Sequence, residues 1–385
     1  MMFDFDNYPF FDNHTHRINI SNRRIRPIDF AMAFVHGRAP VHELDEAAQK
    51  EREYNIMNMG VVKTMISLMA QKYGCEATPE TVIAERNKRT EKDGFAYAQE
   101  LYREAGVIGE VVDDGAVFGD PVLQCFPTKI YRLFQMDPCV RTLLKECEDY
   151  QVFMTTFDAV LRQRLEEGFI GVKSHLLELR SQPIYPISDE EAAARYQEAV
   201  NGDRKAFEDV YLAAFQQVLI MTQELGFSVH VHTGCTGNPN DLQTNTDPYV
   251  LAPLMRDDRF ADARIVLLHG NPPDFGHAAW LTHCYPNVWV DIGWSLPWLS
   301  LNIEQILETV IGIAPHSKVM FGSGQHDHAE VVWAASKIIK TALANVLERK
   351  VNAGLLSKEQ AEETARQLLY KNALRLYGLE EPDRG

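Results

Sequence analysis

"FSVHVHTG", residues 227–234, has the composition of a buried β-strand and ends in polar residues that include a histidine. Short apolar runs of the same kind recur along the chain, and segments with apolar residues at helical spacing separate the later ones. Strands that alternate with helices predict βα units and a parallel sheet. The candidate strands are residues 9–16, 106–114, 128–134, 169–174, 227–234, 264–270, 287–293 and 318–324.

These eight units predict an α/β fold, a (β/α)8 TIM barrel, whose usual length is ~250 residues. Most of the additional length lies between the first and second candidate strands, at about 17–105, where several charged helical patterns occur. A connection of this length requires helices of its own. We therefore expect a single barrel domain over residues 1–385, with a lid-like helical insertion after the first strand.

The composition excludes several classes of partner. The chain has 385 residues and a formal net charge of -16, whereas binding to nucleic acid or to acidic membranes depends on clustered basic residues. The N-terminus lacks the basic start and apolar run of a signal peptide, so a cytoplasmic protein is expected. The six cysteines form no CxxC pair and are interpreted as reduced thiols.

Polar residues at strand ends indicate the functional site. In "DNHTH", residues 12–16, His14 and His16 are two positions apart, so both side chains can lie on one face of a strand. A histidine pair alone equally fits two hydrogen-bonded polar residues. However, Lys173, His232 and His269 occupy corresponding strand ends, and parallel strands of a barrel converge at one mouth. His230 lies one layer deeper than His232 and is predicted to be buried and hydrogen-bonded.

Several motifs in this order resemble the amidohydrolase superfamily, specifically the amidohydrolase-related branch that includes the hydrolase part of nodulin/glutamine synthetase-like fusion proteins. They are "DNHTH", "GFIGVKS", "VHVHTG", "IVLLHGNPP", "YPNVWVDIG", "KVMFGS" and the closing "NALRLYGL". The resemblance implies an enzyme that binds one or two divalent ions, Zn or Mn, through His14, His16, His232 and His269. It also implies a carbamate on Lys173 that bridges two ions; the alternative is an unmodified lysine.

Two positions depart from the family pattern. Gly324 stands where strand eight usually carries the Asp that binds metal and takes the proton of water, and strand three reads Arg132, Leu133, Phe134 in place of a motif that ends in Glu. Gly324 could be an engineered substitution, or the protein could be a metal-binding pseudoenzyme. Alternatively, the base has moved to Asp327, His326 or His328, although Asp327 could instead cap the following helix.

The reaction implied by this resemblance is hydrolysis of an amide-type C–N bond by metal-activated water. His269 and Asp327 are the predicted catalytic residues, and Arg132 and Arg180 could bind a substrate carboxylate. The substrate is expected to be a small polar or anionic molecule, and a homo-oligomer is possible. A non-oxidative decarboxylase or a lyase is the alternative. If Gly324 replaces a base, Gly324→Asp should increase metal affinity.

Overall fold

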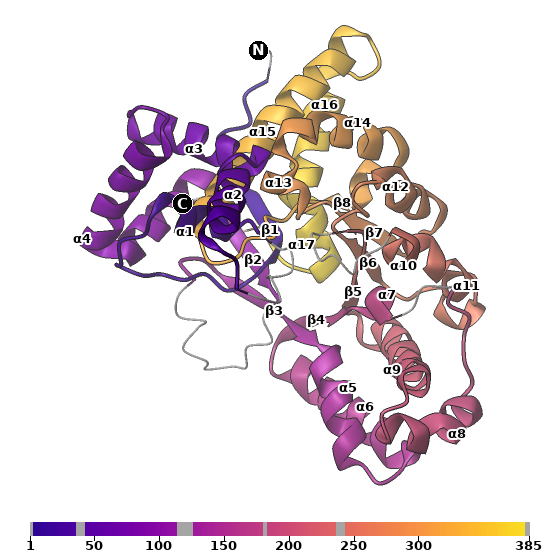
Figure 1. Cartoon of the computed structure of the whole chain (residues 1–385). Coiled ribbons are helices and arrows are strands. Elements are labelled where there is room, and N and C mark those ends of the chain that lie inside the picture. The colour runs from indigo at the N-terminus through magenta and orange to yellow at the C-terminus, as the bar shows by residue number, and fades with distance from the viewer. Residues whose placement is uncertain (1–2, 36–42, 114–125, 180–182, 236–242, 382–385) are drawn as a thin grey trace.

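A computed structural model describes residues 3–35, 43–113, 126–179, 183–235 and 243–381. Its centre is a sheet of eight parallel strands in which each strand pairs with the next one along the chain (Figure 1). All eight predicted strands are confirmed. They are β1 (Phe10–Thr15), β2 (Val107–Val112), β3 (Ile130–Gln135), β4 (Phe169–Ser174), β5 (Ser228–His232), β6 (Ile265–Leu268), β7 (Val288–Asp291) and β8 (Val319–Met320).

Backbone hydrogen bonds between β1 and the segment after β8 close the sheet. The amide of Asn13 donates to Phe321 O at 3.0 Å, the amide of Gly324 to His14 O at 2.8 Å, and the amide of His16 to Gln325 O at 3.0 Å. The register of β1 against β2 shifts between Asp12 and Thr15, which is the irregularity of a bulge. The predicted TIM barrel is therefore confirmed, with an irregular seam that runs beside both histidines of "DNHTH".

Helices surround the barrel in chain order (Figure 1). Between β1 and β2 lie α1 (Pro27–Met32), α2 (Glu46–Met57), α3 (Gly60–Tyr73) and α4 (Pro79–Ala105); after β3, α5 (Met136–Glu146) and α6 (Tyr150–Glu166); after β4, α7 (Leu176–Leu179), α8 (Asp189–Val200) and α9 (Arg204–Leu225). The later strands are followed by α10 (Gln243–Thr246) and α11 (Ala252–Met255), by α12 (Phe275–Cys284), by α13 (Ser295–Trp298) and α14 (Ile303–Ile313), and by α15 (Ala329–Asn352), α16 (Lys358–Arg366) and α17 (Asn372–Tyr377).

The predicted insertion after the first strand contains α1 to α4. Helix α4 packs beside α15, and buried apolar residues of the two helices belong to one core cluster. A buried ion pair between Arg86 and Glu330, at 2.7 Å, joins the same two helices. Phe30 of α1 stacks on His328 in the loop after β8, with ring centroids 5.0 Å apart. The insertion thus contacts one loop of the barrel mouth, while its action as a lid stays a prediction.

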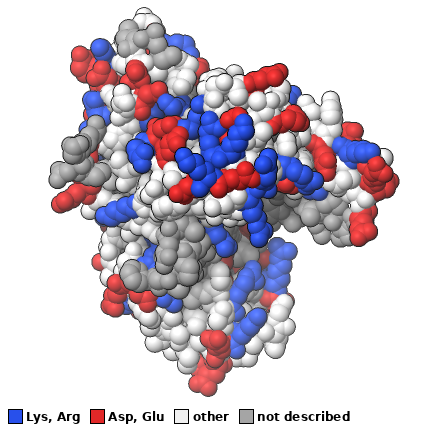
Figure 2. Space-filling view, turned by 90° about the vertical axis from the view of Figure 1, so that its left-hand side faces the viewer, with Lys and Arg blue, Asp and Glu red and all other residues white. Residues whose placement is uncertain are grey.

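The surface over these helices carries both signs of charge. Figure 2 shows the side of the molecule on which α3 and α4 lie, with Lys and Arg intermixed with Asp and Glu. The ion pairs Lys72–Glu100 and Arg89–Glu85, at 2.8 and 3.0 Å, are two examples. Among the described residues, no helix has the length and hydropathy that crossing a membrane requires.

Tyr377, the last residue of α17, links two opposite strands of the barrel. Its hydroxyl donates to Asn13 Oδ1 of β1 at 2.5 Å and lies 3.2 Å from His230 Nε2 of β5. His230 also lies 3.1 Å from Ser228 Oγ. The prediction that His230 is buried and hydrogen-bonded is confirmed. Beneath the strand ends, the barrel is therefore filled by a polar network as well as by apolar side chains.

Candidate metal centre

Four histidines predicted from the strand ends form one continuous row. The His14 ring centroid lies 4.9 Å from that of His16 and 5.1 Å from that of His269, and the His269 centroid lies 4.6 Å from that of His232. At the end of the row, His326 stacks on His16 with centroids 4.0 Å apart. The convergence of β1, β5 and β6 at one mouth accounts for this arrangement.

Asp113, the residue directly after β2, completes a group of donors with His14 and His16. One ligand atom from each of these residues lies within 4.8 Å of the other two. The carbonyl oxygen of Asp113 is 2.6 Å from His16 Nδ1, which must donate to it. This hydrogen bond leaves the Nε2 lone pair of His16 free to bind an ion, the usual arrangement for a metal-ligating imidazole.

Lys173 of β4 lies beside this group and donates to Asp113 Oδ2 at 2.9 Å. Gln135 donates to the other carboxylate oxygen, also at 2.9 Å. Burial raises the pKa of Asp113, but the Lys173 ammonium and His16 outweigh that effect and hold the pKa below its ordinary value. Asp113 is therefore ionised at neutral pH, and the closest partner of Lys173 is this carboxylate.

The histidines of the row are neutral. Burial lowers the pKa of His16 to about 4 and holds those of His14, His232 and His269 well below the ordinary value. A neutral imidazole has a lone pair that can bind a metal ion, whereas an imidazolium has none. Both ring nitrogens of His14 and Nδ1 of His269 are buried and have no hydrogen-bond partner among the described residues. This donor set fits a divalent transition ion.

His269 is held by a run of left-handed backbone. It directly follows β6 and has a φ of 71°, and Gly270 and Asn271 follow with φ of 69° and 64°. The hydroxyl of Thr233 donates to Leu268 O and accepts from the amide of Asn271, which ties the turn to the end of β5. Left-handed residues other than glycine are uncommon and cluster at functional sites. The turn places the ring of His269 between those of His14 and His232.

Two predicted residues, Arg132 and Asp327, are not brought to the row, and a third lies where the structure makes no description. Arg132 donates to the carbonyl of Glu167 at 2.6 Å, in the turn before β4 and therefore at the end of the barrel opposite the histidines. The Asp327 side chain is exposed, and its backbone pairs with Ile18. The alternative role of Asp327, as a cap of the following helix, is wrong, because His328 is the N-cap of α15. Arg180 lies outside the described residues.

The backbone at Gly324 does not have the geometry expected of a position from which a catalytic carboxylate has been lost. Its φ is +56°, and the three atoms closest to a Cβ added there all belong to Trp294, the nearest being Cα at 3.1 Å. A side chain at this position would start against the backbone after β7 rather than against the row of histidines. The substitution Gly324→Asp would therefore meet both steric and conformational resistance, and its effect on metal affinity stays a prediction.

Three residues near the row were not predicted from the sequence, namely Asp113, His175 and Glu178. Asp113 and His175 directly follow β2 and β4, so the strand-end argument that selected His232 and His269 could have identified them. Glu178 lies in the short helix α7, and no pattern in the sequence indicated it. A carboxylate beside the histidines is thus found after strand two, with Asp113.

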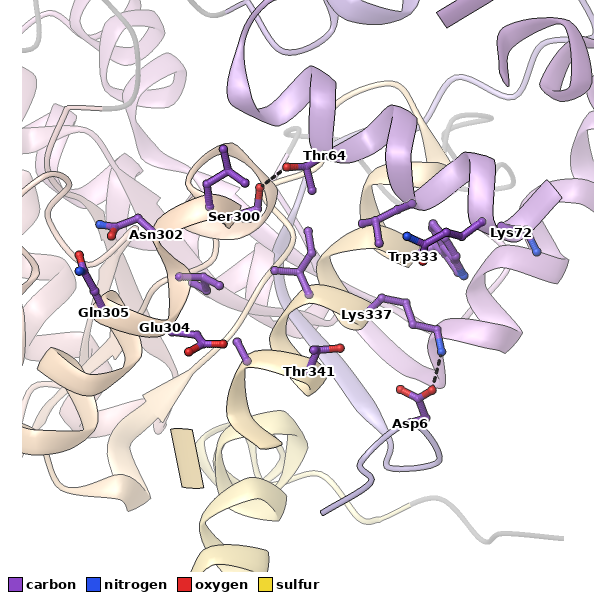
Figure 3. A pocket seen from close by; sticks show the side chains of 16 residues that line it. Asp6, Thr64, Lys72, Ser300, Asn302, Glu304, Gln305, Trp333, Lys337 and Thr341 are labelled. Atoms are coloured by element: carbon purple, nitrogen blue, oxygen red, sulfur yellow. Dashed lines mark hydrogen bonds and ion pairs between the residues drawn. The ribbon is translucent and has the colours of Figure 1, made fainter. Parts of the chain in front are cut away.

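A separate surface groove of about 700 Å³ lies among α3, the segment 300–305 and α15 (Figure 3). Thr64, Lys72, Trp333 and Lys337 are among its lining residues, and no histidine of the row is. Ser300 donates to Thr64 across the groove at 3.1 Å. Because the groove lies between outer helices rather than at the strand ends, it is not the candidate catalytic site.

Comparison with known sequences identifies the family of the chain. Residues 148–379 match the sequence pattern of the amidohydrolase family. Protein fluG from Emericella nidulans is 31% identical over 154 residues. This match spans 40% of the present chain and 18% of fluG, so the two proteins correspond over less than a fifth of the relative's length.

Solved structures with the same fold cover nearly the whole chain. A candidate metal-dependent hydrolase from Lactobacillus casei superposes with a TM-score of 0.81 at 16% identity, over 98% of both chains. Uronate isomerase from Thermotoga maritima gives 0.71 at 15% identity, over 97% of this chain and 95% of the isomerase. Glucuronate isomerase from Caulobacter crescentus gives 0.67 at 14%, over 98% and 93%. At these identities the similarity establishes the fold.

Proposed function

Because the chain belongs to the amidohydrolase family, we propose that it is a metal-dependent hydrolase that cleaves an amide-type C–N bond in a small polar or anionic molecule. The observation that supports this proposal most directly is the buried group of His14, His16 and Asp113 at the barrel mouth. Neutral imidazoles and an ionised carboxylate are the ligands that Zn and Mn sites use. The row continues to His269 and His232, so other neutral imidazoles lie beside the same group.

In this proposal, His14, His16 and Asp113 hold the ion. A bound divalent ion would lower the pKa of water and polarise a carbonyl group. Asp113 supplies an anionic oxygen within the group, which is one of the two properties expected of the missing strand-eight Asp. The presence of this carboxylate argues against a pseudoenzyme. His269 is neutral and adjacent to His14, so it can exchange a proton with the substrate.

The ion pair between Lys173 and Asp113 determines when Lys173 could carry the proposed carbamate. As an ammonium it neutralises Asp113 at 2.9 Å. A carbamate in its place would put two anions next to each other unless a cation lay between them. We therefore expect Lys173 to remain an ammonium while one ion or none is bound, and carbamylation to accompany only the uptake of a further ion.

The insertion at 17–105 is proposed to exclude bulk water from the bound substrate. The stacking of Phe30 on His328 places α1 against the loop that also carries His326, whose ring contacts His16. A covered mouth favours a small substrate over a polymer. A decarboxylase or a lyase on the same scaffold is the alternative, because polarisation of a carboxylate by the same ion would serve that reaction.

The test is an activity screen of the Zn- and Mn-loaded protein with N-acyl amides, γ-glutamyl amides and aromatic carboxylates. In water enriched in oxygen-18, hydrolysis places one heavy oxygen in the carboxylate product. Release of carbon dioxide without that incorporation would instead identify a decarboxylase. His14→Ala should abolish turnover, whereas His277→Ala, a change at a half-exposed histidine paired with Asp247, should not.

A further inference from the structure

A second surface groove, of about 510 Å³, lies on the side of the barrel where α5, α8 and α9 are found (Figure 1). It is lined by the second half of α5, by the last residue of α7 and by the turn that joins α8 to α9. No residue of the candidate metal group lines it. Its volume falls in the range of about 300–1,000 Å³ that sites for small organic molecules occupy.

Part of the lining is apolar. It includes Leu144 of α5, Leu179 of α7, Val200 of α8 and Phe207 of α9. Leu144 is buried, whereas Val200, the last residue of its helix, is 41% exposed. An aliphatic chain placed against these side chains would remove apolar surface of both molecules from water, which is favourable. The lining therefore favours a ligand with an apolar body.

Two cationic side chains border this apolar surface. Arg141 and Lys145 are exposed and lie four residues apart, so they share one face of α5. The guanidinium carbon of Arg141 is 4.5 Å from the centroid of the Phe207 ring. A guanidinium that packs on a ring keeps the donors in its own plane available for a carboxylate. Among the residues that the structure describes, neither cation has a carboxylate within ion-pair distance.

The two carboxylates of the lining, in contrast, have partners of their own. Asp203 is the N-cap of α9, and its Oδ1 accepts from the amide of Ala206 at 2.8 Å. Glu208 Oε1 accepts from Arg204 Nε at 3.1 Å. The lining thus contains three cationic and two anionic side chains, an excess of one positive charge, in a chain whose formal net charge is -16. A local positive charge of this kind attracts an anion, and its size matches a single negative charge.

We propose that this groove binds a small monocarboxylate with an aliphatic body. The carboxylate head pairs with Arg141 and Lys145, and the chain covers Val200 and Phe207. One guanidinium can donate two parallel hydrogen bonds to one carboxylate, which fixes the head while the apolar contacts hold the body. The site uses no residue of the candidate metal group, so it goes beyond the proposed function and does not depend on it.

The experiment is calorimetric titration of the full-length protein with octanoate, both after chelation of metal and after loading with Zn²⁺. Octanoate should bind the two forms with similar affinity. Acetate, which lacks the body, should show no measurable binding, and octanol, which lacks the charge, should bind about 10-fold more weakly or worse. Equal binding of octanol and octanoate, or no binding of octanoate at millimolar concentration, would overturn the proposal.

Variants of the lining locate the bound molecule. Val200→Asp places an anion in the groove and should weaken octanoate binding by at least about 10-fold, because like charges repel. Its matched control is Val152→Asp, since Val152 is a 38% exposed valine of α6 that does not line the groove. That variant should bind octanoate as the wild type does.

Charge removal tests the carboxylate head separately. Arg141→Gln should weaken octanoate binding by about 10-fold, because a charge-assisted hydrogen bond is lost. Lys205→Gln, a change at an exposed lysine of α9 outside the lining, should leave the affinity unchanged. Thermal unfolding checks that each variant is folded. Octanoate binding that requires Zn²⁺, or that Val200→Asp leaves unchanged, would place the carboxylate outside the groove and count decisively against this site, without touching the proposed function.

Discussion

Lys173 and Asp113 form an ion pair of 2.9 Å whose side chains are 2% and 1% exposed. Lys173 comes from β4 and Asp113 directly follows β2, so the pair spans the end of β3. Asp113 is also the carboxylate of the candidate metal group. A cationic side chain thus balances this carboxylate, so we expect metal binding to be coupled to the ion pair.

Lys173→Met should destabilise the metal-free protein by about 3–5 kcal/mol, because Asp113 would remain buried without its cationic partner. Zn²⁺ should then stabilise this variant more than it stabilises the wild type, since the ion replaces the lost charge. Urea unfolding with and without Zn²⁺ measures both effects. Arg86→Met, which breaks a buried ion pair with Glu330 that includes no member of the candidate metal group, is the control: it should cost a similar amount and show no additional response to Zn²⁺. Equal Zn²⁺ stabilisation of Lys173→Met and wild type would contradict the coupling.

Gly324→Ala should destabilise the protein more than Gly74→Ala. Both glycines have left-handed backbone, with φ of +56° and +64°, which costs a non-glycine residue about 1 kcal/mol. A Cβ at Gly74 has nothing within 4 Å, whereas at Gly324 it lies 3.1 Å from Trp294 Cα. Denaturant unfolding measures the destabilisation in each variant, and the difference between the two is the part that the contact with Trp294 causes. Gly324→Asp should not increase bound Zn²⁺; an increase would show that this position reaches the ion after all.

The buried carboxyl group of Glu110 in β2 predicts that the difference in stability between the wild type and Glu110→Gln depends on pH. Burial, and then the nearby Asp12, raise its pKa to about 8, so the folded protein keeps this carboxyl protonated at neutral pH. The unfolded chain has already released that proton above its ordinary pKa near 4.5. The contribution of Glu110 to stability is therefore lost as pH rises to about 8. From pH 6 to 8, the free energy of unfolding of Glu110→Gln should increase relative to that of the wild type by about 1.4 kcal/mol per pH unit. Unfolding at several pH values checks this, and a constant difference would refute it.

Zn²⁺ uptake by the group of His14, His16 and Asp113 should persist to unusually low pH. Burial lowers the pKa of His16 to about 4 and holds that of His14 well below its ordinary value, so protons compete with the ion less than at an exposed histidine. The Zn²⁺ affinity of the group should therefore change little from pH 7 to 5 on account of these imidazoles. Competition with a chromophoric chelator measures the Zn²⁺ affinity at each pH. A steep loss that begins near pH 6.5 would mean that the two imidazoles titrate as exposed ones do.

The sequence alone determined the barrel and the imidazole row. Apolar runs separated by helical segments predicted eight strands, and the polar residue at the end of each run then had only one place to lie, because the carboxyl ends of parallel strands meet at one mouth. His14, His16, His232 and His269 were found by this argument and meet in the structure. The resemblance to the amidohydrolase family rested on the same residues.

Only the tertiary structure decided which charged groups join that row. Asp113 and Lys173 are 60 residues apart, and nothing local to either shows that they pair. Arg132 was placed on the correct strand, but its guanidinium reaches the opposite end of the barrel. The direction of a side chain depends on register shifts and on individual φ values, such as the bulge in β1 and the left-handed backbone at Gly324 and His269. These features arise from contacts between distant segments, so a pattern of residue types fixes where a strand ends but not toward which neighbour each side chain turns.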